Sequence, residues 1–381
     1  MCQSILITMM PIVMHARMQS KPTIIIAAIS SRPYVKAATE AGFEVIAIDM
    51  FADIDTQKLA KKVYQVAVFE NQFDLEALLQ VLEEVSAYQP VGFCYGSGFE
   101  RHPEHLRKIE ALVHVLGNSA ESVQYCKNPQ SFFKFCDDLS MTYPETSHTK
   151  PAHHEGWLTK QIGGCGGCHV SPLGVFFDEE AKGVYFQRHQ SGIAISCLFL
   201  VCEDQVKVIG YHEQWSNPQD TLSYQYGGAV SHIALADWVK SDLESFVKEA
   251  AKKMGLVGLN SCDAILADDK LYILEINPRL SASVDLYTPV VGNLFAAHVA
   301  ASKKETVGDL VISTTAKAHH VHYAQHEMLI TESFNWPHWV CDIPEVGQRI
   351  EKNRPLCTVI AQAETATQAK QLVQNRARLF N

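Results

Sequence analysis

The sequence has no excess of positive charge, and this argues against one large class of partners. Its 381 residues include 32 Lys and Arg against 42 Asp and Glu, which gives a formal net charge of -10. Proteins that bind nucleic acid meet the phosphate backbone with a basic stripe or patch. We therefore predict no nucleic-acid partner, and a phosphate-bearing ligand would need individual lysines instead.

Long apolar runs are also missing. The run from Ile5 to Met14 is too short to cross a membrane and has no Lys or Arg before it, and no later run approaches the required length. We predict no membrane partner. Residues 1–20 are expected to be a disordered leader, with order beginning near Lys21, and a signal peptide is the alternative.

The cysteines do not show the paired spacing of a disulfide framework. Eleven of them are scattered over the chain, which indicates reduced thiols and a cytoplasmic location. The sequence also lacks a G-x-G-x-x-G fingerprint, so dinucleotide binding has no support. With 47% hydrophobic and 19% charged residues, the composition is that of a globular protein, and the length predicts two or three domains.

The N-terminal third alternates between apolar runs and helical segments, which is typical of a small parallel α/β unit. The loop from Gly96 to Glu100 follows one of its strands, at the edge where such sheets bind ligands, so it is either a substrate contact or a plain turn. Strands are predicted at Thr23–Ile29, Phe43–Asp49 and Gly92–Tyr95, and helices at Tyr34–Ala41 and Leu75–Ser86.

A glycine-rich loop follows the strand predicted at Gly156–Lys160. Its glycines let backbone N–H groups turn toward an anion, and Lys160 adds a positive charge just before them, as a lid over phosphates requires. Cys165, Cys168 and His169 in the same loop match the C-x-x-C-H haem-attachment pattern, which leaves a haem or redox protein as an alternative. The glycines are Gly163, Gly164, Gly166 and Gly167.

The stretch from Leu271 to Ser283 carries the strongest chemical signal. Glu275 and Asn277 are two apart in an apolar run, so they share one face of a strand. If residues 268–270 form the turn of a hairpin, Ala267 pairs with Leu271 and Asp263 lies opposite Glu275. Carboxylates that close repel each other unless a cation lies between them, and oxygen ligands favour Mg²⁺ or Mn²⁺. A surface hairpin with ordinary charges is the alternative.

The remaining segments give weaker signals. The connector from Gln187 to Gly192 follows a strand and can present its backbone to a purine edge. Further predictions are one helix at Ser122–Leu139 with Lys127 near its start, a turn at Tyr226-Gly227-Gly228, helices at Leu243–Met254 and Thr365–Leu379, and strands near Ala316–Gln325 and Leu356–Ala363.

Taken in order, these elements resemble the ATP-grasp superfamily, which includes biotin carboxylases and carboxylate–amine ligases. The order is Lys127, Lys160 with its glycine loop, the Gln187–Gly192 connector, Asp263, and E-x-N-P-R at Glu275 to Arg279. The resemblance implies an α/β fold in three parts: an N-terminal parallel α/β (preATP-grasp) domain at 21–118, a two-lobed α+β ATP-grasp domain at 119–305, and a small C-terminal β-rich segment at 306–381.

The resemblance also implies ATP and Mg²⁺ as cofactors, with Mn²⁺ as an alternative ion, and it assigns roles to residues. Lys127 and Lys160 would contact the phosphates, under a lid formed by Gly163, Gly164, Gly166 and Gly167. The adenine and ribose would be lined by Gln187, Arg188, His189 and Gln190, and the metal would be held by Asp263, Glu275 and Asn277. Arg279 would act at the transferred phosphoryl group, with Lys160 as the second catalytic residue. Asp263 replaces a Glu common in relatives, and its shorter side chain would weaken one metal contact. Tyr226, Gly227, Gly228, Ser281 and Ser283 are the candidates for substrate contact.

The activity implied is that of an ATP-dependent carboxylate–amine ligase, which forms an amide bond through an acyl phosphate. Within the superfamily, the patterns FQ-x₃-SG and E-I-N-P-R-x-S-x-S and the segment WVCDIP…PLCTVIA resemble the subgroup of tyramine–glutamate ligases of methanofuran biosynthesis. Partners would then be a small-molecule carboxylate and an amine, with a homodimer as one option. A nucleotide-binding sensor without catalysis and the redox protein remain as alternatives.

Overall fold

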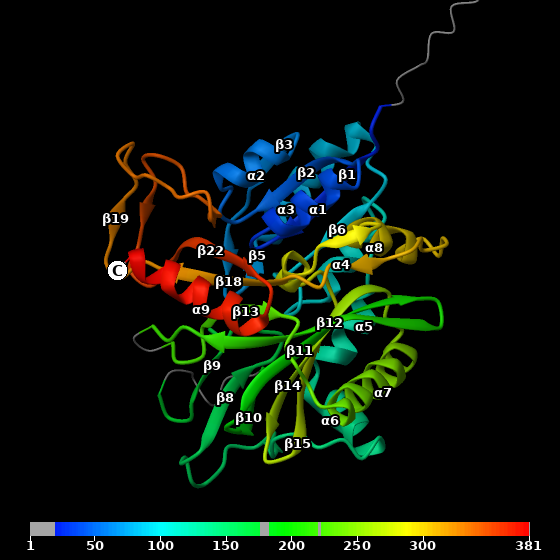
Figure 1. Ribbon diagram of the computed structural model, residues 1–381. Helices are drawn as coiled ribbons and strands as arrows, with labels where there is room; N and C mark the ends of the chain where they lie inside the picture. The colour runs from blue at the N-terminus through cyan, green and yellow to red at the C-terminus, as the bar shows by residue number, and fades with distance from the viewer. Residues whose placement is uncertain (1–19, 176–182, 220–221, 381) are drawn as a thin grey trace, which may run out of the picture.

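The computed structural model describes residues 20–175, 183–219 and 222–380. Apart from Ser20, the predicted leader lies outside this part of the chain. Figure 1 shows a small N-terminal sheet, a long curved sheet across the middle, and a second small sheet beside the long one. None of the helices within these ranges is long and apolar enough to cross a membrane.

The N-terminal unit is a parallel sheet, as predicted. Its strand order is β3-β2-β1-β6, and each neighbouring pair is parallel. β1 and β2 are buried on both faces, which is why they read as continuous apolar runs. The strands are β1 (Thr23–Ala28), β2 (Glu44–Asp49), β3 (Lys62–Gln65) and β6 (Phe93–Tyr95), with the hairpin β4 (Val68–Phe69) and β5 (Gln72–Phe73), and helices α1 (Arg32–Glu40), α2 (Ile54–Leu59), α3 (Leu75–Val85) and α4 (Glu104–Glu110).

The single helix predicted at Ser122–Leu139 is wrong, because the chain forms two helices there. α5 (Ala120–Lys127) ends before Asn128, and α6 (Pro129–Asp138) begins with Pro129. Proline cannot donate the hydrogen bond that would continue α5, and the Asn128 side chain accepts from the N–H groups of Gln130 and Ser131 to start α6. Lys127 therefore lies at the end of a helix rather than near its start.

The second small sheet is antiparallel, with strand order β7-β10-β8-β9. It carries the glycine loop between β8 and β9, so it forms one lobe of the predicted two-lobed domain. Its strands are β7 (Thr146–Ser147), β8 (Trp157–Gln161), β9 (Val170–Pro172) and β10 (Val184–Arg188).

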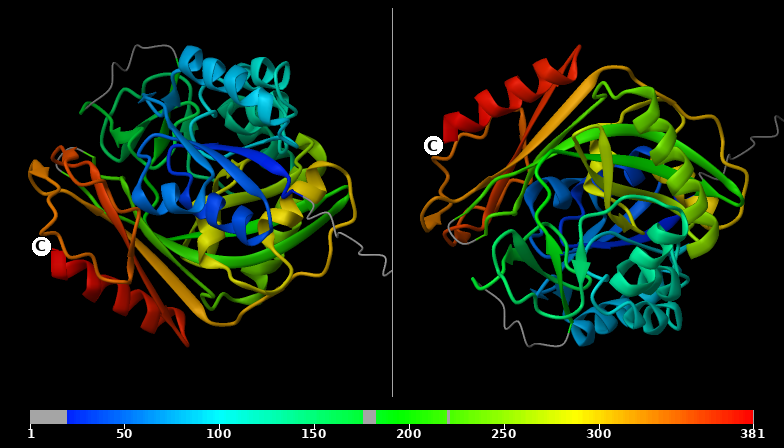
Figure 2. Two further views of the ribbon diagram at one scale, coloured as in Figure 1. Left: turned by 90° about the horizontal axis from the view of Figure 1, so that it is seen from above. Right: turned by 90° about the horizontal axis from the view of Figure 1, so that it is seen from below.

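The long sheet has eight strands in the order β15-β14-β11-β12-β13-β18-β22-β20. The C-terminal segment is β-rich, as predicted, but β18 and β22 continue the sheet that begins with β15, and α9 (Ala366–Ala377) covers their outer face (Figure 2). The strands are β11 (Ile193–Cys202), β12 (Gln205–Ser216), β13 (Tyr226–Ser231), β14 (Gly258–Ala267), β15 (Lys270–Asn277), β18 (Ala316–Tyr323), β20 (Val340–Cys341) and β22 (Pro355–Ala363).

The predicted turn at Tyr226-Gly227-Gly228 is also wrong, because these residues begin strand β13. A Cβ atom on Gly228 would lie 2.2 Å from the carbonyl oxygen of His319 on β18. The glycines therefore allow neighbouring strands to approach closely, and they imitate a turn signal in the sequence.

The two faces of the long sheet are covered by different parts of the chain, and this difference shows which face carries Asp263. Along β11, Cys197 and Phe199 pack with helices α5, α6 and α7 (Asp237–Met254), whereas Leu198 and Leu200 pack with α8 (Leu294–Ser302) and the N-terminal unit. Ser196 shares the face of Leu198, and it pairs with Asp263 of β14. Asp263 therefore faces the N-terminal unit.

Candidate functional site

The hairpin of β14 and β15 brings Asp263 opposite Glu275, as predicted, but by a different route. The turn contains only Asp268 and Asp269, both with positive φ, so Ala267 pairs with Lys270 rather than Leu271. The register then shifts once between Asp263 and Ala264, and this bulge restores the pairing of Asp263 with Glu275.

The bulge also changes which side chains reach the site. Consecutive residues of a regular strand point to opposite faces. Here Leu274 is the extra residue of the bulge, and both Leu274 and Glu275 line the same pocket. An apolar and a charged side chain are therefore presented side by side.

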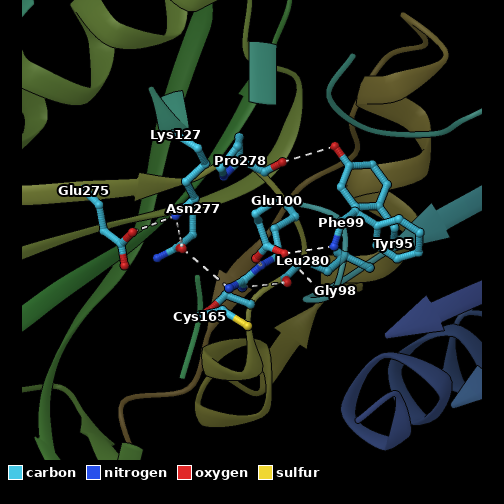
Figure 3. Close-up of polar contacts among 12 residues, drawn as sticks. Tyr95, Gly98, Phe99, Glu100, Lys127, Cys165, Glu275, Asn277, Pro278 and Leu280 are labelled. Carbon is cyan, nitrogen blue, oxygen red and sulfur yellow. Dashed lines mark hydrogen bonds and ion pairs between the residues drawn. The ribbon is translucent and has the colours of Figure 1, made fainter. Parts of the chain in front are cut away.

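A chain of polar contacts links the three predicted metal ligands to Lys127, and Figure 3 shows its part between Lys127, Glu275 and Asn277. The Lys127 ammonium donates to Oε2 of Glu275 at 2.7 Å and to Oδ1 of Asn277 at 2.8 Å. The Asn277 amide nitrogen donates to Oδ2 of Asp263 at 2.9 Å, and Gln214 donates to the other oxygen at 3.1 Å. The structure thus brings Lys127 together with the three predicted metal ligands, Asp263, Glu275 and Asn277, at one end of β15.

The two carboxylates differ in charge balance. Burial raises the pKa of Asp263, and the charge of Glu275 raises it further. Burial acts on Glu275 in the same direction, but Lys127 and other cations outweigh it and hold the pKa of Glu275 low. The Asp263 carboxylate is thus short of positive charge, since its hydrogen-bond donors Asn277 and Gln214 are neutral. Because the donors are oxygens and a carboxylate lacks a cation, the residues fit a hard divalent ion such as Mg²⁺.

Arg279 is held by a residue that the sequence did not identify as its partner. Its Nε donates to Oε1 of Glu100 at 2.6 Å, and its terminal nitrogen lies 3.4 Å from Oδ1 of Asn277. The second oxygen of Glu100 accepts from the N–H groups of Gly98 and Phe99. The loop from Gly96 to Glu100 thus contacts the site through Arg279. Only its place after a strand could have indicated this.

Lys160 lies on β8 and points toward the connector. Its ammonium donates to Oε1 of Gln187 at 2.8 Å, and burial lowers the pKa of Lys160. The Gln187 amide also donates to Thr146. A lysine that is buried without a carboxylate in contact has charge available for an anionic ligand.

The glycine loop is packed between the N-terminal unit and β13. A Cβ atom on Gly163 would lie 2.5 Å from Cα of Arg101, and one on Gly167 would lie 1.8 Å from the carbonyl oxygen of Tyr224. The carbonyl oxygen of Gly166 accepts from the N–H of Tyr226. The loop therefore closes over the space between the two lobes.

A small pocket, partly open to solvent, lies beneath this loop. It is lined from both lobes and from α5 and α6, and it combines one aromatic side with charged and glycine residues. The lining includes Lys127, Phe132, Phe133, Gly163, Gly164, His169, Tyr185, Leu274 and Glu275. Among these, Phe132, Phe133 and Tyr185 were not predicted, because an aromatic residue in an amphipathic segment has the pattern of an ordinary core residue.

Other predicted residues are not among those that line this pocket. Arg188 and His189 are exposed, and the Arg188 guanidinium lies over the Trp157 ring; Gln190 donates to the carbonyl oxygen of Ser191. Ser281 and Ser283 contact each other through their hydroxyls. Tyr226 contacts His319 on β18. Gly227 and Gly228 serve the packing of β13.

The C-x-x-C-H residues are poorly placed for haem. Cys165 and His169 are 7% and 9% exposed, and the His169 ring nitrogen Nδ1 contacts the Cys165 carbonyl oxygen. Burial also raises the pKa of Cys165, so its thiol is protonated. A covalently bound porphyrin would need open space beside these side chains, whereas the His169 ring packs directly against Gly164.

Comparison with known proteins agrees with this geometry. The family model described as "ATP-grasp domain" matches residues 126–283, a range that contains Lys127, the glycine loop and the β14–β15 hairpin. The chain contains an ATP-grasp domain. The matched range ends at Ser283, just after the E-x-N-P-R element.

Relatives of the ATP-grasp chain include both curated proteins and solved structures. The carbamoyl phosphate synthase large chain of Haemophilus ducreyi is 22% identical over 290 residues, which is 68% of this chain and 26% of that protein; the chain therefore spans about a quarter of its length. The L-amino acid ligase of Bacillus licheniformis superposes with a TM-score of 0.69 at 14% identity, covering 94% of this chain and 97% of that one. The biotin carboxylase domain of Hydrogenobacter thermophilus 2-oxoglutarate carboxylase, solved with MgADP and bicarbonate, gives 0.68 at 13% identity, covering 91% and 87%. These likenesses establish the ATP-grasp fold.

Proposed function

We propose that the protein is an ATP-dependent carboxylate–amine ligase that uses Mg²⁺. The observation that carries the proposal is the contact chain from Lys127 through Glu275 and Asn277 to Asp263, which lies beside a pocket covered by a glycine loop within an ATP-grasp domain. The MgADP complex of the biotin carboxylase domain supports the same cofactors.

The residues divide the work of phosphoryl transfer. Asp263, Glu275 and Asn277 would hold Mg²⁺, which neutralises phosphate charge when it is bound. Lys127 and Lys160 add positive charge from two different lobes, and Arg279 lies next to Asn277 with its orientation fixed by Glu100. The glycine loop would shield the reacting groups from water when the substrates are bound. The reaction then requires an acyl phosphate and an attacking amine, with ADP and phosphate released.

The identities of the two substrates, the carboxylate and the amine, rest on less direct evidence than the reaction type. The patterns FQ-x₃-SG and E-I-N-P-R-x-S-x-S support glutamate as the carboxylate and a tyramine-like amine, in a methanofuran-type cofactor pathway in the cytoplasm. Tyr226, Ser281 and Ser283 are the proposed contacts to substrate. A homodimer is also proposed, since the biotin carboxylase domain was solved as a dimer.

The test is ATP-dependent phosphate release, with the amide product detected by mass. Wild-type protein is screened with glutamate paired with tyramine, tyrosine and related amines, with and without Mg²⁺. Glu275→Gln should abolish release without unfolding the protein. Glu213→Gln is the matched control, because Glu213, on β12 of the same sheet, forms a 2.6 Å ion pair with Lys370 of α9 but does not line the pocket.

The outcomes separate the functions. Phosphate release that survives in the Glu275→Gln variant would contradict the metal role. Tight ADP binding without turnover for any amine would favour the nucleotide-binding sensor over the ligase.

A further inference from the structure

A second group of metal-ligating side chains lies outside the ATP-grasp pocket. His102, Glu104 and His105 stand where the chain enters α4, and each offers a ligand atom within 4.8 Å of the other two. No other group of three His, Cys, Asp or Glu residues converges in this way in the described part of the chain. The proposed ligase reaction does not use these residues.

The geometry points to a binding site for a transition-metal ion of the zinc class, and we infer that His102, Glu104 and His105 are its three protein ligands. Nδ1 of His102 lies 3.0 Å from Oε1 of Glu104, and the two imidazole rings are stacked with centroids 5.3 Å apart. Ligand atoms in a tetrahedral zinc site lie roughly 3.4 Å apart, given metal–ligand distances of about 2.0–2.2 Å. Small side-chain rotations would therefore complete the site.

The donor set of the group also suits a metal. Two imidazoles and one carboxylate are a donor set that zinc accepts, and a fourth position stays open for water.

A supporting residue orients one of the ligands. The side-chain amide nitrogen of Gln72 lies 2.6 Å from Nδ1 of His105, which leaves Nε2 as the free ring nitrogen. A half-turn of the amide, which exchanges its oxygen and nitrogen, would let the Gln72 oxygen accept from Nδ1–H and fix the tautomer that binds a metal through Nε2. Histidine ligands of metals usually have such a partner on the second nitrogen.

The proposed zinc site lies next to residues that support the ATP-grasp pocket. Arg101, the neighbour of His102, forms an ion pair with Glu70, and its Cα is the atom that Gly163 of the lid approaches. Glu100, one residue earlier, holds Arg279. An ion bound by His102 and His105 would therefore fix the turn that supports both Arg279 and the lid.

The test is Zn²⁺ binding by calorimetry to chelator-treated full-length protein, with excess Mg²⁺ present to fill the sites that prefer oxygen ligands. Wild type should bind one Zn²⁺. His102→Ala and His105→Ala should weaken binding more than about tenfold, and Gln72→Ala by about tenfold or more. His114→Ala is the matched control, because His114 contacts Glu110 at 2.9 Å in the same region without a second histidine, and it should bind as wild type does.

Three results would overturn the inference. These are a wild-type protein that binds no Zn²⁺, unchanged affinity in both His102→Ala and His105→Ala, and a Co²⁺ complex with the strong thiolate charge-transfer band that would place the ion on cysteine. Glu275→Gln should leave Zn²⁺ binding intact, so failure of the ligase proposal and failure of the zinc site can be told apart.

Discussion

Glu100 and Arg279 are 179 positions apart in the chain, yet they form a buried ion pair with 2.6 Å between Oε1 and Nε. The Glu100 side chain is 1% exposed and that of Arg279 is 10% exposed. Although burial opposes the charge of each, the pair keeps both ionised, and the pKa of Glu100 lies below its ordinary value. The pair connects the N-terminal unit directly to the last residue of the E-x-N-P-R element.

Glu100→Gln should lower kcat for phosphate release while changing the KM for ATP little. The substitution keeps the shape of the side chain but removes the charge that orients Arg279, and small misplacements of a catalytic group can cost up to about 100-fold in rate. Steady-state kinetics on the folded variant measures the effect. Glu121→Gln is the control, because it removes one carboxylate of an exposed ion pair with Arg107. An unchanged kcat would show that Arg279 does not depend on Glu100.

Gly163→Ala should impair ATP binding and turnover more than Gly166→Ala does. Both residues have positive φ, so both variants carry a similar backbone cost of roughly 1–2 kcal/mol. Only at Gly163 would the added Cβ meet the backbone of Arg101, whereas at Gly166 it would meet nothing within 4 Å. An extra cost of about 1.4 kcal/mol would correspond to roughly tenfold in rate or affinity. Equal kinetics for the two variants would mean that the loop does not close against Arg101.

The free energy of unfolding should fall as the pH drops from about 6.5 toward about 4, and His298 should contribute to that fall. His298 is 1% exposed; its Nδ1 accepts from the N–H of Leu259, and its Nε2–H donates to the carbonyl oxygen of Leu116. Burial lowers its pKa to about 4. The unfolded chain binds a proton near pH 6.5, so the stabilisation is complete above that pH and is lost as the pH approaches the folded pKa.

His298→Gln measures this contribution, because the amide can accept and donate in a similar way without titrating. Denaturant unfolding at a series of pH values should show a smaller loss between pH 6.5 and 4 for the variant, by on the order of 3 kcal/mol at the acid end. Parallel curves for the two proteins would contradict the prediction.

Replacing both Cys165 and Cys168 by Ser should leave most of the ligase activity. Cys165 is buried with a raised pKa, and the Cys168 thiol contacts Asn71 and the Cys165 carbonyl oxygen, so neither is placed as a nucleophile for ATP. Phosphate release and a visible absorption spectrum of the purified protein are the measurements. Complete loss of activity, or a haem band, would restore the redox alternative.

The sequence predicted the local chemistry better than the local geometry. The E-x-N-P-R element and the carboxylate opposite it depend on strand periodicity, and this is why Asp263, Glu275 and Asn277 were predicted together. The length of the turn and the bulge at Leu274 were not predicted, and their two shifts cancel at Glu275. A pairing can thus be right although the register nearer the turn is wrong.

Contacts between distant segments could not be predicted in the same way. Nothing in a single sequence couples Glu100 to Arg279, because the contact depends on how the N-terminal unit packs against the long sheet. The break at Asn128-Pro129, by contrast, had a local signal, since the residue before a proline is disfavoured in a helix. At Tyr226-Gly227-Gly228 the local signal was misleading, because glycines that allow close packing of neighbouring strands cannot be told in the sequence from the glycines of a turn.

The shared eight-stranded sheet determines what shortening the chain would do. β22 pairs with β18 along almost its whole length, and β18 pairs with β13. A chain truncated before Pro355 would leave the N–H and C=O groups of β18 unpaired at the edge of the sheet, and apolar residues now under α9 would face water. Unpaired sheet edges bind strands from other molecules. Truncation there is therefore expected to yield aggregates rather than a smaller working enzyme.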